Sequence, residues 1–213
     1  MSTFKNREDA GCRLAERLLQ YRDEAPVVLT LPRGGVPVGA EIAHALDAPL
    51  DVIIARKLGA PGQPELAIGA VAPGGVRLVN ERLVRWMGIP EDWIEQAAER
   101  ELGEVERRMR RFRKERPEPE IKGRTVILVD DGIATGMTAR AAIRAVLAVE
   151  PRRVVLAVPV CAKETAEKLS REVDELVCLT MPDDLWAIGL WYRDFHQIPD
   201  KEVIDLLERA YET

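Results

Sequence analysis

The sequence predicts an α/β fold with a doubly wound, mostly parallel sheet, and three observations support that class. Short apolar runs recur without the polar alternation of half-exposed strands, which is typical of strands covered on both faces. Helical segments separate these runs, as in a parallel sheet. With 213 residues and 46% hydrophobic side chains, the chain can bury such a sheet in one domain, 1–213. The predicted strands are 27–31, 50–55, 125–131, 153–160 and 175–180.

Helices are predicted between and around these strands. Residues 7–23 place Ala10, Leu14, Leu18 and Tyr21 at helical spacing, which predicts an amphipathic helix with one buried face. The other helices expected around the sheet are 36–47, 138–150, 162–172 and one that begins near Pro199.

Two further strands are predicted outside this alternation. Residues 66–72 and 76–80 should pair as a hairpin around the turn Pro73-Gly74-Gly75. The preceding segment, 56–65, holds two prolines and two glycines in ten residues, which predicts a mobile loop. Its part 58–66 is a candidate to close over a ligand and exclude water.

Residues 81–120 form a helical block of a different kind. Apolar residues at three- and four-residue steps predict a long helix over 91–116. Its end, 107–116, carries seven basic residues in ten, for which two interpretations are open: a nucleic-acid patch, or a solvated helix face that pairs with acidic neighbours. The whole block holds 10 basic and 11 acidic residues, which favours the second interpretation.

Composition excludes several classes of protein. The net charge is −5, whereas a protein that binds nucleic acid over its whole surface is more often basic. Neither of the two serines lies in a G-x-S-x-G setting, which excludes a serine hydrolase of that kind. The cysteines Cys12, Cys161 and Cys178 are odd in number and far apart, which indicates reduced thiols. Without an apolar signal segment or membrane span, we expect a cytoplasmic protein with no membrane or nucleic-acid partner.

The segment most informative about chemistry is VILVDDGIATGMT, residues 126–138. Its apolar strand delivers Asp130 and Asp131 to the carboxyl end, where ligands bind in open α/β sheets. The turn that follows carries Thr135 and Thr138 and opens a helix, whose free N–H groups favour an anion. Phosphate suits that turn, and a diol suits the two carboxylates. The implied ligand is therefore a sugar phosphate.

This segment resembles the signature with which type I phosphoribosyltransferases bind phosphoribosyl pyrophosphate (PRPP): an apolar strand, paired acids and a loop with T-G-x-T. The order of other features is similar over residues 25–180. The sequence PRGG at 32–35 follows the first strand, and an Arg-Lys pair at 56–57 follows the next. The resemblance implies the type I phosphoribosyltransferase-like fold, with 81–120 as a helical insertion and a small hood element to which 181–213 contributes.

The resemblance also implies roles for individual residues. Asp130 and Asp131 would be the catalytic carboxylates that bind the ribose hydroxyls, and Mg²⁺ would reach them indirectly through PRPP and water. A non-proline cis peptide is implied next to Arg33. The residues implied to hold the ribose phosphate are Ala134, Thr135, Gly136, Met137 and Thr138. Those implied to hold pyrophosphate are Arg33, Gly34, Gly35, Arg56 and Lys57.

The acceptor site rests on fewer residues. Trp186, within residues 185–189, is similar to the aromatic residue that stacks on the base in purine-salvage members; the alternative is that it pins the C-terminal segment to the core. Glu65 is a candidate acid/base group, and the alternative is an exposed glutamate without a role.

The resemblance as a whole implies an enzyme, a PRPP-dependent pentosyltransferase of nucleotide salvage. It would transfer ribose 5-phosphate from PRPP to a nitrogenous base, with a purine favoured, and release pyrophosphate. We expect it to be a homo-oligomer, specifically a dimer. The alternative is a non-catalytic regulatory protein that senses PRPP or a nucleotide with the same fold.

Overall fold

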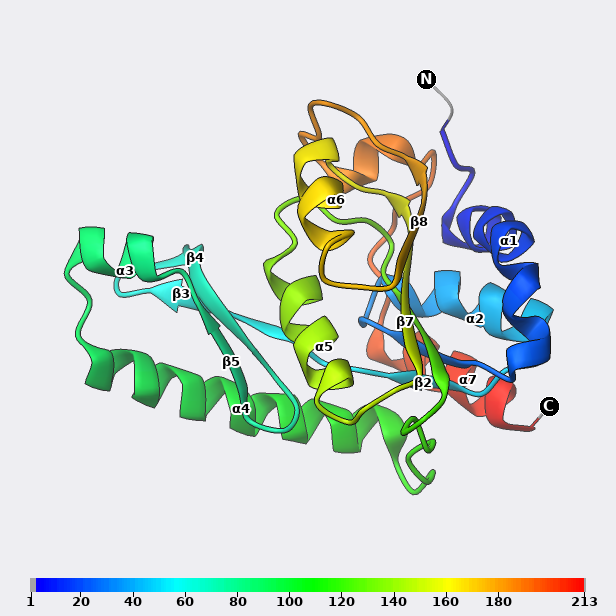
Figure 1. Cartoon of the computed structure of the whole chain (residues 1–213), viewed down its shortest axis with the longest axis horizontal. Helices are drawn as coiled ribbons and strands as arrows, with labels where there is room; N and C mark the ends of the chain where they lie inside the picture. The colour runs from blue at the N-terminus through cyan, green and yellow to red at the C-terminus, as the bar shows by residue number, and fades with distance from the viewer. Residues whose placement is uncertain (1–2, 213) are drawn as a thin grey trace.

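The computed structural model describes residues 3–212 and holds two β-sheets within them (Figure 1). The larger sheet has the strand order β2-β1-β6-β7-β8, and each neighbouring pair is parallel. The predicted α/β fold with a parallel sheet is thereby confirmed. The strands are β1 (Val27–Thr30), β2 (Leu50–Val52), β6 (Thr125–Val129), β7 (Arg153–Val160) and β8 (Glu175–Thr180).

Helices cover both faces of this sheet. Successive strand residues point to opposite faces, and since the side chains on both faces are apolar, both faces need cover. Ile127 of β6 lies in one buried cluster with Leu14 of α1 and Ile42 of α2, whereas its neighbour Leu128 lies in the cluster that contains Ile143 of α5. Strands buried on both faces carry no polar positions, which explains their unbroken apolar runs. The helices are α1 (Arg7–Leu18), η1 (Leu19–Glu24), α2 (Gly35–Leu46), α5 (Met137–Leu147), α6 (Lys163–Leu169), η2 (Ile188–Trp191) and α7 (Asp200–Glu212).

The second sheet belongs to an arm that projects from the core (Figure 1). The predicted mobile loop at 56–65 is wrong: these residues form an antiparallel hairpin with its turn at Pro61-Gly62. Glycine and proline lie at this turn and at a bulge, where a Cβ on Gly59 would come within 2.7 Å of the Cα of Pro64. The elements of the arm are β3 (Arg56–Ala60), β4 (Gln63–Ala72), β5 (Val76–Val79), α3 (Glu81–Met87) and α4 (Glu91–Arg113).

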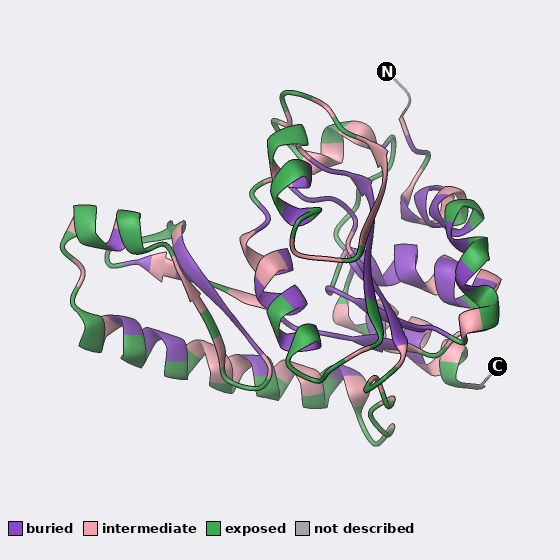
Figure 2. Cartoon of the chain, in the orientation of Figure 1, coloured by how far each residue is buried: buried purple, intermediate pink, exposed green. Residues whose placement is uncertain are grey.

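The long helix α4 supports this hairpin. Leu58 and Ile68 of the hairpin are buried in one cluster with Ile94 and Ala98 of α4, so packing against the helix holds the two strands in place. Figure 2 shows buried and exposed residues alternating along α4, as expected for a helix with one apolar stripe. The predicted hairpin of β4 and β5 is confirmed. The block 81–120 is helical as far as Arg113, where α4 ends three residues before the predicted end at 116.

The basic run at the end of α4 is largely paired with carboxylates. Arg107 and Arg108 contact Glu104, and Arg111 contacts Asp200 at 2.8 Å. Arg113 pairs in the same way with β2, and Lys114 with α7. These ion pairs support the solvated-face interpretation of the run. Among the described residues, no helix combines the length and apolar character needed to cross a membrane.

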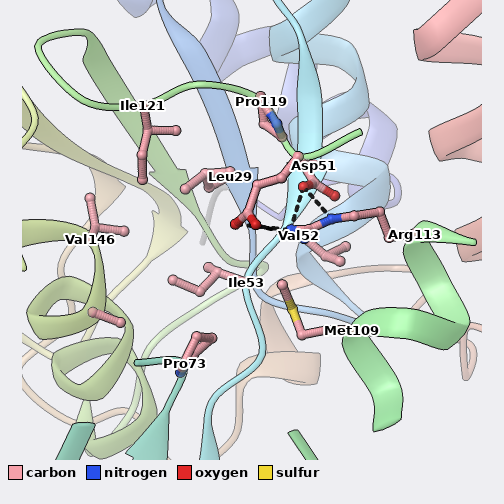
Figure 3. A pocket seen from close by; sticks show the side chains of 12 residues that line it. Leu29, Asp51, Val52, Ile53, Pro73, Met109, Arg113, Pro119, Ile121 and Val146 are labelled. Atoms are coloured by element: carbon pink, nitrogen blue, oxygen red, sulfur yellow. Dashed lines mark hydrogen bonds and ion pairs between the residues drawn. The ribbon is translucent and has the colours of Figure 1, made fainter. Parts of the chain in front are cut away.

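A small cavity separates the C-terminal end of α4 from β2 and α5, and one ion pair bridges it (Figure 3). The buried carboxylate of Asp51 lies 2.7 Å from an amino group of Arg113, which also contacts the exposed Glu118. Met109 and Ile53 supply apolar walls. The ion pair therefore joins the arm to the edge strand of the main sheet.

We expect Arg113→Met to reduce the free energy of unfolding by about 3 kcal/mol, because it leaves the Asp51 carboxylate buried without its partner. Urea unfolding measures the loss. The control is Arg110→Met, at an exposed position of the same helix with no side-chain partner among the described residues.

The loss of unfolding free energy in Arg113→Met should also depend on pH. Burial raises the pKa of Asp51 even in the presence of Arg113, so the folded chain binds this proton more tightly than the unfolded chain. The stabilisation from protonation is present at low pH and disappears as the pH rises through the raised pKa. Arg113→Met should accordingly lose less free energy of unfolding at acidic than at neutral pH. An equal loss of unfolding free energy in Arg110→Met would contradict this account.

Candidate functional site

The candidate site lies where β1 and β6 end side by side. These strands pair in parallel as far as Thr30 and Val129, and Leu31 then donates a backbone hydrogen bond of 2.9 Å to the Val129 carbonyl. The sheet order places β2 on one side of β1 and β6–β8 on the other, so the strand order reverses between β1 and β6. Ligands of open α/β sheets bind at such switch points. The segments after the two strands, 32–35 and 130–136, are thus brought together.

Two glycines allow these segments to touch. A Cβ on Gly34 would lie 2.5 Å from the Cγ of Asp131 and would overlap its carboxylate. A Cβ on Gly35 would lie 2.8 Å from the Val129 carbonyl oxygen. Both positions therefore need glycine for the close approach of neighbouring groups rather than for an unusual φ. The peptide bond between Pro32 and Arg33 is cis, as the sequence resemblance implied.

The two carboxylates occupy a strongly perturbed environment. Asp131 is buried and Asp130 is half-buried; the Asp131 amide donates a 2.8 Å hydrogen bond to Asp130 Oδ1. Burial and the neighbouring Asp131 charge hold the pKa of Asp130 well above its ordinary value. Burial also raises the pKa of Asp131, which the Arg7 guanidinium opposes. Perturbed acids at a strand end are typical of functional sites.

The turn after the carboxylates leaves a helix N-terminus open. Helix α5 begins at Met137, and its N-cap, Gly136, has a φ of +75° and no side chain to accept from the first-turn amides. Thr135 is exposed, and Thr165 Oγ1 donates a 2.6 Å hydrogen bond to the Ala134 carbonyl, which fixes the turn. The free amides at α5 suit a phosphate group. That the segment from Ala134 to Thr138 binds phosphate stays a prediction.

The two arginines assigned to pyrophosphate have carboxylate partners in this structure. Arg33 is exposed and lies 3.6 Å from Asp200 Oδ1, and Arg56 forms an ion pair with Glu101 of α4. Lys57, on β3, is exposed. An anionic ligand would therefore have to compete with two carboxylates for the arginines.

The two residues assigned to acceptor chemistry lie apart from this cluster of contacts. Glu65 is exposed on β4 of the arm and makes no hydrogen bond or ion pair within the described part of the chain. Trp186 is 90% exposed in the segment between β8 and η2. Ile188, the first residue of η2, does reach the carboxylate turn, since its Cγ2 would lie 2.5 Å from a Cβ on Gly132. The roles of Glu65 and Trp186 stay predictions.

The sequence did not reveal two residues that contact Asp131. Arg7 Nε donates a 2.8 Å hydrogen bond to Asp131 Oδ2, and Tyr192 Oη donates one of 2.6 Å to the Asp131 carbonyl. Arg7 did carry a signal, because it lies one helical turn before Ala10 on the buried stripe of α1.

A magnesium ion would find few protein ligands here. Within residues 3–212, no three His, Cys, Asp or Glu side chains are grouped closely enough to hold a metal ion. Asp130 and Asp131 offer carboxylate oxygens, but one oxygen of Asp131 is already bonded to Arg7. Mg²⁺ commonly keeps several waters and binds through one or two carboxylates together with substrate phosphates. The two carboxylates therefore suit a Mg²⁺ ion only if its other ligands are phosphate oxygens and water.

Comparison with known proteins identifies a domain family and relatives that match most of this chain. The phosphoribosyl transferase domain matches residues 3–193. A Mycobacterium tuberculosis protein named as a putative phosphoribosyl transferase is 46% identical over 211 residues, which are 99% of this chain and 48% of that protein. This chain thus spans about half the length of the curated relatives it matches.

Solved structures share the fold. A Thermus thermophilus protein has a TM-score of 0.83 and 43% identity, with 98% of this chain and 99% of that chain covered. A purine phosphoribosyltransferase from Pyrococcus horikoshii has a TM-score of 0.50 at 18% identity, with 91% and 92% covered, and so shows the fold alone. Since the domain match extends over most of the sequence, this chain belongs to the phosphoribosyl transferase domain family.

Proposed function

We propose that this protein transfers ribose 5-phosphate from PRPP to a nitrogenous base, with a purine favoured, and releases pyrophosphate. One observation carries the proposal: the Gly34-Gly35 loop, the Asp130-Asp131 pair and the open N-terminus of α5 meet at one edge of the sheet. The three parts match the three parts of PRPP, which are pyrophosphate, a ribose diol and a phosphate.

In this reaction the bonds form and break in the substrates, and the protein mainly positions them and stabilises charge. A ring nitrogen of the base forms a bond to the anomeric carbon, and the bond from that carbon to pyrophosphate oxygen breaks with its electron pair. The nitrogen then loses its proton to solvent. Positive charge grows on the ribose and negative charge on the leaving group, so Asp130 and Asp131 would stabilise the ribose while Arg33, Arg56 and backbone amides hold pyrophosphate.

Members of this family generally use Mg²⁺, which would neutralise charge on the departing pyrophosphate. On the protein side, Asp130 and Asp131 would orient the ribose hydroxyls that share the ion, and the remaining ligands would be phosphate oxygens and water. The arm would contribute Arg56 and Lys57 from the start of β3.

Calorimetry with PRPP and MgCl₂ tests the proposal, followed by an assay of pyrophosphate release with a panel of purine and pyrimidine bases. We expect PRPP to bind with Mg²⁺ and one or more purines to trigger release. Absence of PRPP binding overturns the proposal. PRPP binding without release for any base would support the non-catalytic regulator instead.

For the acceptor site, we expect Trp186→Ala to raise the KM for the base roughly 10-fold and to leave the affinity for PRPP unchanged, because base stacking is worth about 1–3 kcal/mol. The matched control is Trp86→Ala, since Trp86 is 80% exposed on the arm helix α3 and has no assigned role. Equal KM values in the wild-type protein and Trp186→Ala would remove Trp186 from the acceptor site.

A further inference from the structure

The segment before α1 and the segment that follows η2 meet next to Asp131, although they come from opposite ends of the chain. The Phe4 amide donates a 2.8 Å hydrogen bond to the Trp191 carbonyl, and the Arg193 amide donates one of 2.9 Å to the Phe4 carbonyl. The rings of Phe4 and Tyr192 pack with their centroids 5.3 Å apart. The N-terminal segment is thereby fixed to the segment that follows η2, before α1 begins.

Arg7, at the start of α1, is held at three points in this junction. It is 6% exposed, and its Nε donates to Asp131 Oδ2 at 2.8 Å. A second guanidinium nitrogen donates a 2.9 Å hydrogen bond to the His196 carbonyl, and the guanidinium carbon lies 3.8 Å from the centre of the Phe195 ring. A guanidinium fixed in this way has a defined direction, as does the carboxylate that it binds.

The backbone of Asp131 is held from the same side. Tyr192 is buried, and its hydroxyl donates a 2.6 Å hydrogen bond to the Asp131 carbonyl. On the other side, the carboxylate lies against Gly34, where an added Cβ would overlap it. Main chain and side chain of Asp131 are therefore both constrained, by residues far away in the sequence.

We propose that Arg7 is a positioning residue, which fixes the Asp131 carboxylate in the orientation that binds the ribose diol of PRPP. This inference rests on the proposed function. Arg7 acts through Asp131, since its guanidinium is buried against the protein by Phe195 and the His196 carbonyl. A binding group displaced by even a small distance loses much of its effect, which is why the support of such groups matters.

The test compares three variants with the wild-type protein. Arg7→Met removes the hydrogen bonds, and we expect the Kd and KM for PRPP to rise roughly 10- to 100-fold while the KM for the base stays the same. Arg7→Lys keeps the charge but loses the paired guanidinium donors and the stacking on Phe195, so it should recover only part of the PRPP affinity lost in Arg7→Met. Arg17→Met is the matched control, because Arg17 is exposed on the same helix and makes no side-chain contact within the described part of the chain. It should bind PRPP as the wild type does.

The outcomes separate this inference from the proposed function. If the wild-type protein does not bind PRPP, the proposed function fails and the inference fails with it. If the wild type binds PRPP and Arg7→Met binds it equally well, only the inference is overturned. A fall in kcat without a rise in KM for PRPP would mean that Arg7 acts on the transition state and not on PRPP binding. No recovery in Arg7→Lys would mean that the positive charge does not position Asp131. Either result also overturns the inference. Should Arg7→Met not fold, Arg7→Gln replaces it with the same expected direction.

Discussion

Asp131→Asn is expected to lower the turnover number at least roughly 10-fold, because a hydrogen bond to a charged group is worth about 1.5–3 kcal/mol. Asparagine keeps the size of the side chain but removes the charge that would face the developing positive charge on the ribose. The rate of pyrophosphate release at saturating PRPP measures the change. Asp183→Asn is the control, since Asp183 is an exposed carboxylate paired with Lys163. Unchanged turnover in Asp131→Asn would remove Asp131 from the reaction.

The same change has a second consequence, which allows chemistry and stability to be separated. Asparagine leaves the buried Arg7 without an ionised partner, so we expect the free energy of unfolding to fall by about 3 kcal/mol. In the double variant Asp131→Asn/Arg7→Met both charges are gone, and much of that stability should return. Turnover should stay low. Recovery of turnover in the double variant would mean that lost stability, rather than the lost carboxylate charge, caused the defect.

Much of the fold follows from the sequence because its signals are local. The apolar runs of β6 and β7 are unbroken, since each strand is covered on both faces by helices that its neighbours in sequence provide. The position of the carboxylate pair and of the open turn before α5 was likewise predictable, because strand, turn and helix are contiguous over residues 126–138. That this turn binds phosphate stays a prediction.

The hairpin at 56–65 could not be predicted in this way. Prolines and glycines favour a coil, a turn or a bulge equally, and here the choice depends on packing against α4, whose buried residues begin at Ile94. The contact of Arg7 with Asp131 is also non-local, since 124 residues separate the two. A charged residue inside an apolar pattern was nevertheless a usable signal for both Arg7, on the stripe of α1, and Asp51, within the run of β2.

Gly34→Ala is expected to weaken PRPP binding roughly 100-fold, the loss expected when two hydrogen bonds to a charged group are broken. Gly34 has a φ of −64°, which alanine adopts freely, so the effect must come from contact rather than from backbone conformation. The added methyl group would overlap the Asp131 carboxylate, which must either turn away from Arg7 or push the loop 32–35 from its place. Either movement separates the diol site from the pyrophosphate site.

A matched glycine tells this effect apart from a general cost of substitution. Gly103, on α4, has no atom within 4 Å of an added Cβ, and Gly103→Ala should leave PRPP binding unchanged while stabilising the helix by up to about 1 kcal/mol. Calorimetry with PRPP and MgCl₂ compares the two variants directly. If Gly34→Ala bound PRPP as tightly as Gly103→Ala, the close contact between the glycine loop and Asp131 could not be what assembles the site. A loss confined to Gly34→Ala means that the glycine is required because a carboxylate occupies the space where its side chain would be.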